Sequence, residues 1–289
     1  MTKLQSAPRE RAGSVAGIAR KLECKFRMWQ TLYKNLHPTV TVPSTMKLII
    51  ARELADRGRV RPANSVGVKL RRPLSRRIKV RPGGSDLFTL DEVLHREVYA
   101  VVPELLQSCD CIIDLGAHIG LSSLYFLSRY PRATLLAIEP HIGSFNLLRH
   151  NLEPWIDSGQ CVPLHAAVWS KDGFLSPAVS VDAWYQASFR VQPRGESGAG
   201  SIRGLSMDTL IRMSGSNEIH LVKIDIEGAE AELFRSNLAW LQEVQCLAIE
   251  FHGDSRERIS FDELMARHGF DVVSDTGHTV IALAGKPAR

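Results

Sequence analysis

The sequence predicts an open α/β domain: a mostly parallel, seven-stranded sheet with helices on both faces, preceded by a helical segment and a β-hairpin. From residue 109 onward, short apolar runs alternate with helical segments, the pattern of parallel strands joined by crossover helices. The first run breaks into glycines and then a helix, and the last two runs are separated by a short turn, which indicates a closing hairpin.

Composition agrees with this class. Hydrophobic residues make up 44% of the 289 residues and charged residues 23%, as in globular enzymes. No apolar run approaches the ~20 residues needed to cross a bilayer, and residues 1–13 lack the apolar stretch of a secretory signal. The five cysteines form no CxxC pair, which argues against a zinc or disulfide framework. We therefore expect a cytoplasmic protein.

Charge divides the chain into two parts. Residues 1–81 hold 20 Lys and Arg against 4 Asp and Glu, a net +16, whereas residues 82–289 hold 16 against 27, a net −11. A basic section could attract nucleic acid, anionic lipid or an acidic glycan. The basic residues are scattered rather than clustered with aromatic ones, which favours a solvated surface.

The amino-terminal part is expected to form a cap on the main domain. Apolar residues at three- and four-residue spacings predict a helix over 14–36, and a second helix is predicted from Pro43 to Gly58, with Ser44 or Thr45 as its N-cap. A hairpin is predicted over 66–70 and 77–80, and residues 87–106 look helical. We place the boundary between a basic extension, 1–63, and the main domain, 64–289.

The predicted strands of the main sheet are 111–115, 134–138, 161–168, 221–226, 246–251, 270–273 and 279–283. Residues 176–204 lack apolar periodicity, so we predict a mobile loop there that could close over a substrate.

The first strand ends in a glycine loop. Asp114, Gly116 and Gly120 form a DxGxxxG pattern, and its glycines allow a backbone to approach a bulky ligand closely. It differs from the GxGxxG that holds a pyrophosphate.

The second strand ends at Glu139, followed by Pro140, and a carboxylate there can accept hydrogen bonds from ribose hydroxyls. It lies 25 residues after Asp114, close to the ~20-residue interval of dinucleotide folds. Ser144 and Phe145, one turn into the next helix, could edge an adenine, although Phe145 fits equally well as core.

Two further strand ends carry charge. Lys223, Asp225 and Glu227 share one face by the period of two. A strand buried on both faces should be apolar, so these charges either line the active crevice, which we favour, or pair with one another. His252 ends the next strand and could accept a proton, although a lone histidine is more often structural.

Together these segments resemble the FkbM family of methyltransferases. The resemblance rests on residues 114–120, Glu139-Pro140, the KIDIEGAE of residues 223–230 and the IEFH of residues 249–252, and the loop 81–86 with its preceding hairpin matches the usual lead-in. It covers about residues 64–285. His118 departs from the family, in which Asn is more usual, and residues 1–60 lie outside it.

The resemblance implies a class I, Rossmann-like fold and transfer of a methyl group from S-adenosylmethionine (SAM) to a hydroxyl of a small molecule or glycan. The implied SAM contacts are Ser85, Asp86, Asp114, Gly116, His118, Gly120, Glu139, Ser144, Phe145, Ala167 and Asp225. The implied catalytic residues are Glu227, His252 and Lys223, with Glu227 or His252 as the base. No metal is predicted. A cation site of Asp225, Glu227 and His252 is disfavoured because no second acidic cluster is evident.

Three alternatives differ in class. A nicotinamide-dependent oxidoreductase would require GxGxxG, and the middle glycine is missing. A nucleic-acid methyltransferase would suit the basic section, but the sequence has no Asn-Pro-Pro-aromatic or Asp-Pro-Pro-aromatic motif. A non-catalytic SAM-binding protein is disfavoured by the charged strand end. The acceptor, the role of residues 1–60 and the oligomeric state stay open.

Overall fold

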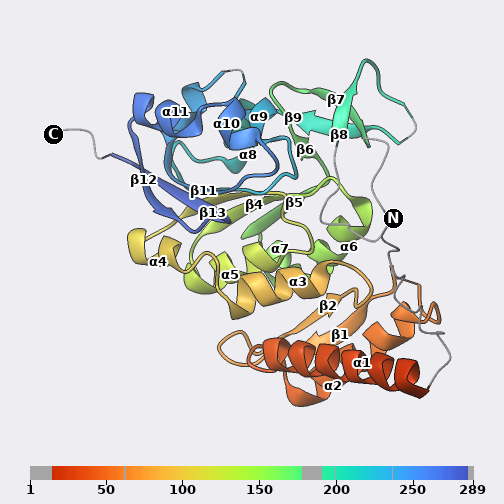
Figure 1. Cartoon of the computed structure of the whole chain (residues 1–289). Coiled ribbons are helices and arrows are strands. Elements are labelled where there is room, and N and C mark those ends of the chain that lie inside the picture. The colour runs from red at the N-terminus through yellow and green to blue at the C-terminus, as the bar shows by residue number, and fades with distance from the viewer. Residues whose placement is uncertain (1–14, 62, 178–190, 199, 236, 286–289) are drawn as a thin grey trace, which may run out of the picture.

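A seven-stranded sheet forms the centre of the molecule. The computed structural model describes residues 15–61, 63–177, 191–198, 200–235 and 237–285. The strand order is β12-β13-β11-β10-β3-β4-β5, and β13 alone of these seven strands runs antiparallel to the others (Figure 1). The strands are β3 (Cys111–Leu115), β4 (Thr134–Ile138), β5 (Cys161–Leu164), β10 (Ile219–Ile224), β11 (Val244–Glu250), β12 (Phe270–Asp275) and β13 (Thr279–Ala284). The predicted sheet is confirmed.

Two hydrophobic cores sandwich this sheet. On β3, Ile112 packs into one core, while Ile113 and Leu115 pack into the other, as the two-residue period of a strand requires. Every residue of β3 is buried, because helices cover both faces.

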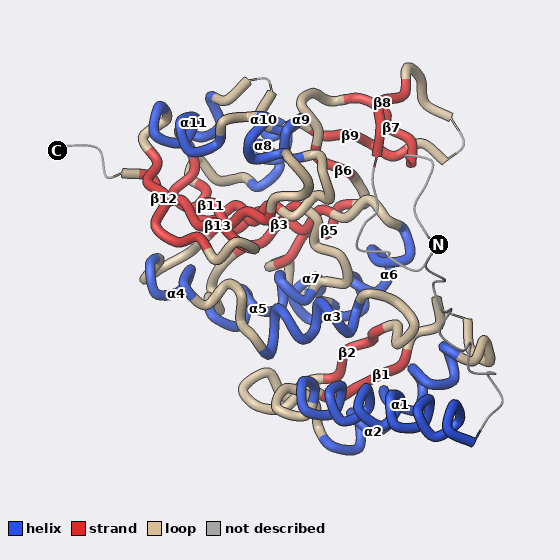
Figure 2. Tube along the Cα trace, in the orientation of Figure 1, coloured by secondary structure: helices blue, strands red, loops and turns tan. Residues whose placement is uncertain are grey.

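The helices form a layer on each side of the sheet (Figure 2). One layer holds α3 (Asp86–Leu90), the π-helix Asp91–His95, α4 (Val101–Leu105), α5 (Leu121–Arg129), α6 (Ile142–Asn151) and α7 (Glu153–Asp157). The other holds α8 (Met207–Ser214), α9 (Glu230–Leu233), the 3-10 helix Ala239–Glu243, α10 (Ser255–Arg258) and α11 (Phe261–Arg267). Among the described residues, no helix combines the length and apolar character needed to span a membrane.

Residues 87–106, which were predicted to be helical, do not form one continuous helix. The structure breaks this stretch into α3, a π-helix and α4, and Glu97 between them has a positive φ of 48°. A left-handed residue cannot continue a right-handed helix, so the chain turns there.

The amino-terminal part packs beneath the main domain in Figure 1. It comprises α1 (Val15–Leu36), α2 (Val42–Asp56) and the hairpin of β1 (Val66–Lys69) and β2 (Arg77–Val80), which confirms the predicted helices and hairpin. The predicted cap of α2 is wrong. Its N-cap is Thr41, and the Ser44 hydroxyl instead accepts a hydrogen bond from the backbone nitrogen of Lys69. Pro43 fits this start because the first helical turn needs no amide hydrogen there.

One side chain joins the hairpin to the glycine loop. The Asn151 amide nitrogen donates to the carbonyl oxygens of Lys79, at 3.0 Å, and Ile119, at 2.9 Å. Its oxygen accepts from the backbone nitrogen of Lys79 at 2.7 Å. Asn151 is fully buried. Its side chain therefore satisfies backbone hydrogen-bonding groups of both β2 and the glycine loop that water cannot reach.

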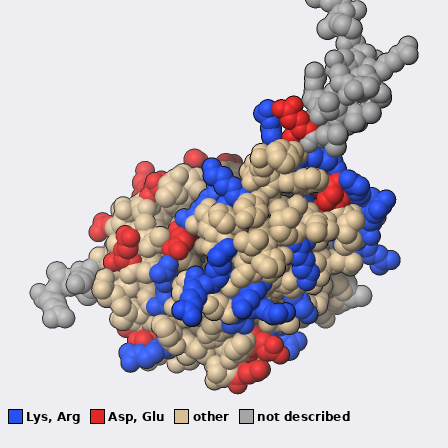
Figure 3. Space-filling view, turned by 90° about the horizontal axis from the view of Figure 1, so that it is seen from below, with Lys and Arg blue, Asp and Glu red and all other residues tan. Residues whose placement is uncertain are grey.

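Positive charge gathers on the lower face of the molecule (Figure 3). The hairpin register contributes to this, because Lys69 lies directly opposite Arg77 and both are exposed. Lys79, opposite Gly67, points to the same side. Like charges directly opposite each other in a sheet are destabilising, so the pairing of Lys69 with Arg77 does not stabilise the hairpin.

The predicted loop over 176–204 is wrong for the residues that the structure describes. A second sheet, in the order β6-β9-β7-β8, contains β6 (Ala167–Val168), β7 (Gly173–Pro177), β8 (Val191–Arg194) and β9 (Ile202–Leu205). These strands are too short to show periodicity. The predicted strand 161–168 is likewise divided between the two sheets. Residues 178–190 and 199 lie outside the described part.

Candidate active site

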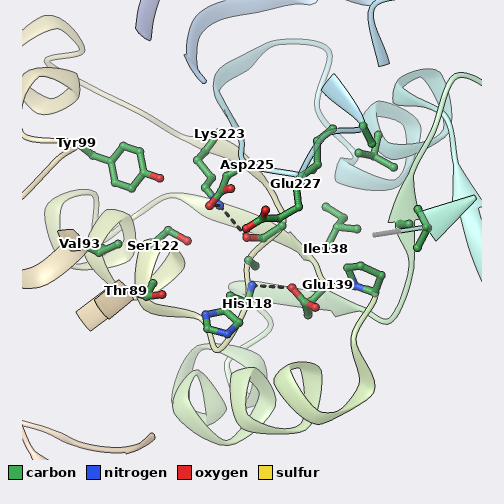
Figure 4. Close-up of a pocket in the computed structure, with 18 residues that line it drawn as sticks. Thr89, Val93, Tyr99, His118, Ser122, Ile138, Glu139, Lys223, Asp225 and Glu227 are labelled. Atoms are coloured by element: carbon green, nitrogen blue, oxygen red, sulfur yellow. Dashed lines mark hydrogen bonds and ion pairs between the residues drawn. The ribbon is translucent and has the colours of Figure 1, made fainter. Parts of the chain in front are cut away.

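A crevice opens at the carboxyl ends of β3, β4 and β10, the edge at which open α/β sheets bind ligands (Figure 4). It brings together seven of the predicted site residues: Gly116, His118, Glu139, Ala167, Lys223, Asp225 and Glu227. It also includes residues that sequence reasoning missed, among them Thr89, Val93, Tyr99, Ser122 and Val191. No local motif marks these residues, because tertiary packing brings them to the crevice.

The glycine loop forms one wall of the crevice. Gly116 has a φ of +73°, and a Cβ at this position would lie 1.8 Å from the carbonyl oxygen of Asp225. The backbone nitrogens of Gly116 and Ala117 both donate to the carbonyl oxygen of Ile138. The loop is therefore fixed to both neighbouring strand ends, and only glycine fits at its closest approach.

Lys223 stabilises the glycine loop by a hydrogen bond from its side chain. Its ammonium donates to the carbonyl oxygen of Gly116 at 2.8 Å, and it lies 3.2 Å from an Asp114 carboxylate oxygen and 3.5 Å from one of Asp225. Burial alone would lower the pKa of Lys223, but the two carboxylates outweigh it and raise the pKa. Lys223 is therefore a fixed positive charge, which suits positioning better than proton transfer.

Asp114 lies behind the loop rather than in the crevice. It is fully buried, and its other oxygen accepts hydrogen bonds of 2.6 Å from the hydroxyls of Ser122 and Ser123. These contacts tie the start of α5 to the end of β3. The geometry thus favours a role of Asp114 in ordering the glycine loop over direct contact with a ligand.

Glu139 presents an oriented carboxylate to the crevice. One oxygen accepts from the backbone nitrogen of His118 at 2.8 Å (Figure 4), and the other accepts from the backbone nitrogen of His141 at 2.7 Å. Burial raises the pKa of Glu139, although these hydrogen bonds and nearby positive groups oppose the rise. The two amides fix the plane of the carboxylate, and each oxygen keeps a second lone pair for a ligand.

Six predicted cofactor contacts do not line the crevice: Ser85, Asp86, Asp114, Gly120, Ser144 and Phe145. Asp86 instead pairs with the buried guanidinium of Arg81 at 2.7 Å. Burial opposes ionisation of Asp86, yet contacts with His118 and Arg81 lower its pKa to about 2.

Arg81 connects this buried pair to the glycine loop. Its guanidinium lies 3.1 Å from His118 Nε2 and donates to the Ser144 hydroxyl at 3.0 Å. The cluster therefore supports the loop from behind. Phe145 packs on the ring of His165, 5.2 Å between centroids, at the edge of the core.

A cluster of carboxylates and a histidine adjoins the crevice. Asp225 and Glu227 line the crevice, whereas the predicted catalytic residue His252 does not. His252 Nε2 lies 3.4 Å from Glu227 and 3.8 Å from Asp225. Its Nδ1 lies 2.9 Å from the buried Glu230, which fixes the ring. Burial alone would lower the pKa of His252, but the Glu230 hydrogen bond and the carboxylates of Glu227 and Asp225 raise it to about 9.

Sequence reasoning missed the outer part of this cluster. Glu250 lies 3.6 Å from His252 Nε2 and 3.4 Å from His278 Nε2, which in turn lies 2.8 Å from Glu92. Burial and the nearby Asp225 and Glu92 raise the pKa of Glu250 to about 8, against the opposing effect of His252. Glu250 belongs to the IEFH segment, residues 249–252, on which the family resemblance partly rests. No sequence motif marks Glu92 or His278.

The fold and this crevice define a class I methyltransferase domain, and comparison with known families agrees. Residues 114–272, more than half of the chain, match the methyltransferase FkbM domain. The protein therefore belongs to the FkbM methyltransferase family. Membership implies SAM as the methyl donor.

Three curated relatives are methyltransferases. Methyltransferase 1 of Beauveria bassiana is 27% identical over 50% of this chain and 66% of its own length, and methyltransferase sdnD of Sordaria araneosa is 28% identical over 59% and 77%. The hexuronic acid methyltransferase AglP of Haloferax volcanii is 26% identical over 54% and 62%. The chain thus spans about two thirds of these relatives.

Proposed function

We propose that this protein transfers a methyl group from SAM to a hydroxyl oxygen of a small-molecule or glycan acceptor. The observation that carries the proposal is the position of Glu227, which lines the same crevice as Gly116 and Glu139 and lies 3.4 Å from His252 Nε2. A proton acceptor thus stands beside the expected methyl donor, which is the arrangement that O-methylation requires.

The residues present fit SAM. Gly116 leaves no room for a Cβ and keeps the loop close to the Asp225 backbone, and Glu139 offers an oriented carboxylate for the two ribose hydroxyls. Asp225, partly exposed in the same crevice, suits the amino group. When bound, SAM supplies a methyl group on a positively charged sulfur, open to attack by an oxygen nucleophile.

Glu227 is the favoured base at neutral pH. With its pKa near 9, His252 carries a proton at pH 7 and pairs with Glu227 rather than accepting a proton itself. The Glu227 carboxylate can take the proton of the acceptor hydroxyl as the new carbon–oxygen bond forms. Lys223, held by the loop carbonyls, keeps that wall in place during transfer.

The acidic rim favours a hydroxyl over an anionic acceptor. Asp225 and Glu227, which line the crevice, would repel a carboxylate that approached the methyl group. The relative AglP acts on hexuronic acid, which supports a glycan among the candidate acceptors. For this chain, the acidic groups of the crevice favour a glycan hydroxyl over the carboxylate that such a sugar also carries.

Replacing Glu139 with alanine is expected to weaken binding of S-adenosylhomocysteine (SAH) about 10- to 100-fold, since two charge-assisted hydrogen bonds to ribose are lost. Calorimetric titration with SAH measures this change. Glu218→Gln, which removes an exposed carboxylate elsewhere, is the matched control and should bind SAH like the unmodified protein. NAD(H) in a parallel titration should give no heat; binding of NAD(H) alone would contradict the proposal.

The ring of His252 is expected to stay protonated up to about pH 9 in metal-free buffer. Because its pKa is raised above the unfolded value, its contribution to stability is complete below about pH 6.5 and is lost as the pH rises through 9. NMR titration of the ring protons measures the midpoint, and Glu230→Gln should lower it. A midpoint at or below 6.5 would instead make His252 the base.

A further inference from the structure

We propose that Asp225, Glu227 and His252 bind a divalent cation such as Mn²⁺, which holds the acceptor hydroxyl beside the methyl donor. Each residue offers one ligand atom, and the three atoms lie within 4.8 Å of one another. Two carboxylates and an imidazole form a ligand set that first-row divalent metals accept. The inference rests on the proposed methyl transfer for its role, because a bound cation lowers the pKa of a coordinated hydroxyl.

The backbone brings these ligands together from two strands. Asp225 directly follows β10, Glu227 lies two residues further on with a φ of +55°, and His252 lies just after β11. Since β10 and β11 are parallel neighbours, their carboxyl ends meet at one edge of the sheet. All three side chains are partly exposed, so an ion can enter from solvent.

The buried Glu230 is an independent observation in favour of a metal. It is fully buried, and its Oε1 fixes His252 Nδ1 at 2.9 Å, which leaves Nε2 facing Asp225 and Glu227. Metal-binding histidines are commonly oriented by a carboxylate in this way. The other Glu230 oxygen is buried with no hydrogen-bond partner among the described residues, so the charge there is incompletely compensated.

The surroundings of the site are strongly acidic. Besides Asp225, Glu227 and Glu230, the carboxylates of Glu92 and Glu250 join the same chain of contacts through His278 and His252. This is the second acidic group that the sequence did not reveal. A divalent cation would balance the negative charge of these carboxylates.

The test is calorimetric titration of chelator-treated, desalted protein with Mn²⁺ and, separately, with Zn²⁺. The unmodified chain should bind one ion per chain. Glu227→Gln and His252→Gln should each weaken binding about tenfold or more, whereas Glu218→Gln should bind like the unmodified chain. Each variant is also titrated with SAH, to show that its SAM site is intact.

Three results would overturn the metal site: no stoichiometric binding of either ion to the unmodified chain, unchanged binding in both site variants, or an equal loss in Glu218→Gln. SAH binding without ion binding would remove the cation and leave the proposed function in place. Ion binding without SAH binding would leave the cation site in place and contradict the proposed function.

Discussion

Replacing Glu227 with glutamine is expected to lower kcat/KM for methyl transfer about 10²- to 10⁴-fold, the range for loss of a general base. Glutamine keeps the size of the side chain but cannot accept the proton of the acceptor. SAH affinity should stay nearly unchanged, because the proposed ribose contact is made by Glu139 and not by Glu227. Transfer of labelled methyl from SAM to a panel of hydroxylated acceptors provides the measurement.

The comparison of Glu227→Gln with Glu139→Ala separates chemistry from cofactor binding. The first variant should lose transfer with SAH binding intact, and the second should lose SAH binding. Equal losses of SAH affinity in the two variants would refute this division. Glu218→Gln again serves as the control for loss of one carboxylate.

Replacing Lys223 with methionine is expected to lower the free energy of unfolding by about 3–5 kcal/mol, since it leaves the fully buried Asp114 without its cationic partner. The carbonyl oxygen of Gly116 also loses its donor. Urea denaturation measures the change.

The matched control for this variant is Lys69→Met on the exposed face of the hairpin, which should change stability by no more than about 0.5 kcal/mol. Similar effects of the two substitutions would show that Lys223 does not hold the glycine loop. A large loss of unfolding free energy in Lys223→Met, together with normal SAH binding by the folded protein, would show that Lys223 contributes to stability and not to SAH binding.

The parts of the site predicted from sequence are those encoded by strand ends. Gly116, Glu139, Lys223, Asp225 and Glu227 each follow or end a buried strand, and parallel strands bring their ends to one edge. A local pattern therefore suffices to place them. The contribution of each to binding or catalysis stays a prediction.

The parts that were missed depend on contacts between distant segments. Glu92 approaches the site from a π-helix and His278 from the closing hairpin, so neither position has a pattern of its own. Asp86 and Ser144 both bond to the buried Arg81 and do not line the crevice, so their contact with the cofactor stays a prediction. Pairing of buried charges is a property of the assembled fold, and spacing along the chain does not encode it.

Asn151 has a practical consequence for anyone dividing this chain into pieces. The family match begins at residue 114, yet Asn151 within it is bonded to Lys79 of the hairpin, and Arg81 and Asp86 support His118 from outside the match. A cut at residue 114 would expose the amide of Asn151 and remove the backing of the loop. The smallest autonomous catalytic fragment is therefore longer than the family boundary suggests, and chimaeras with relatives should exchange the hairpin and the glycine loop together.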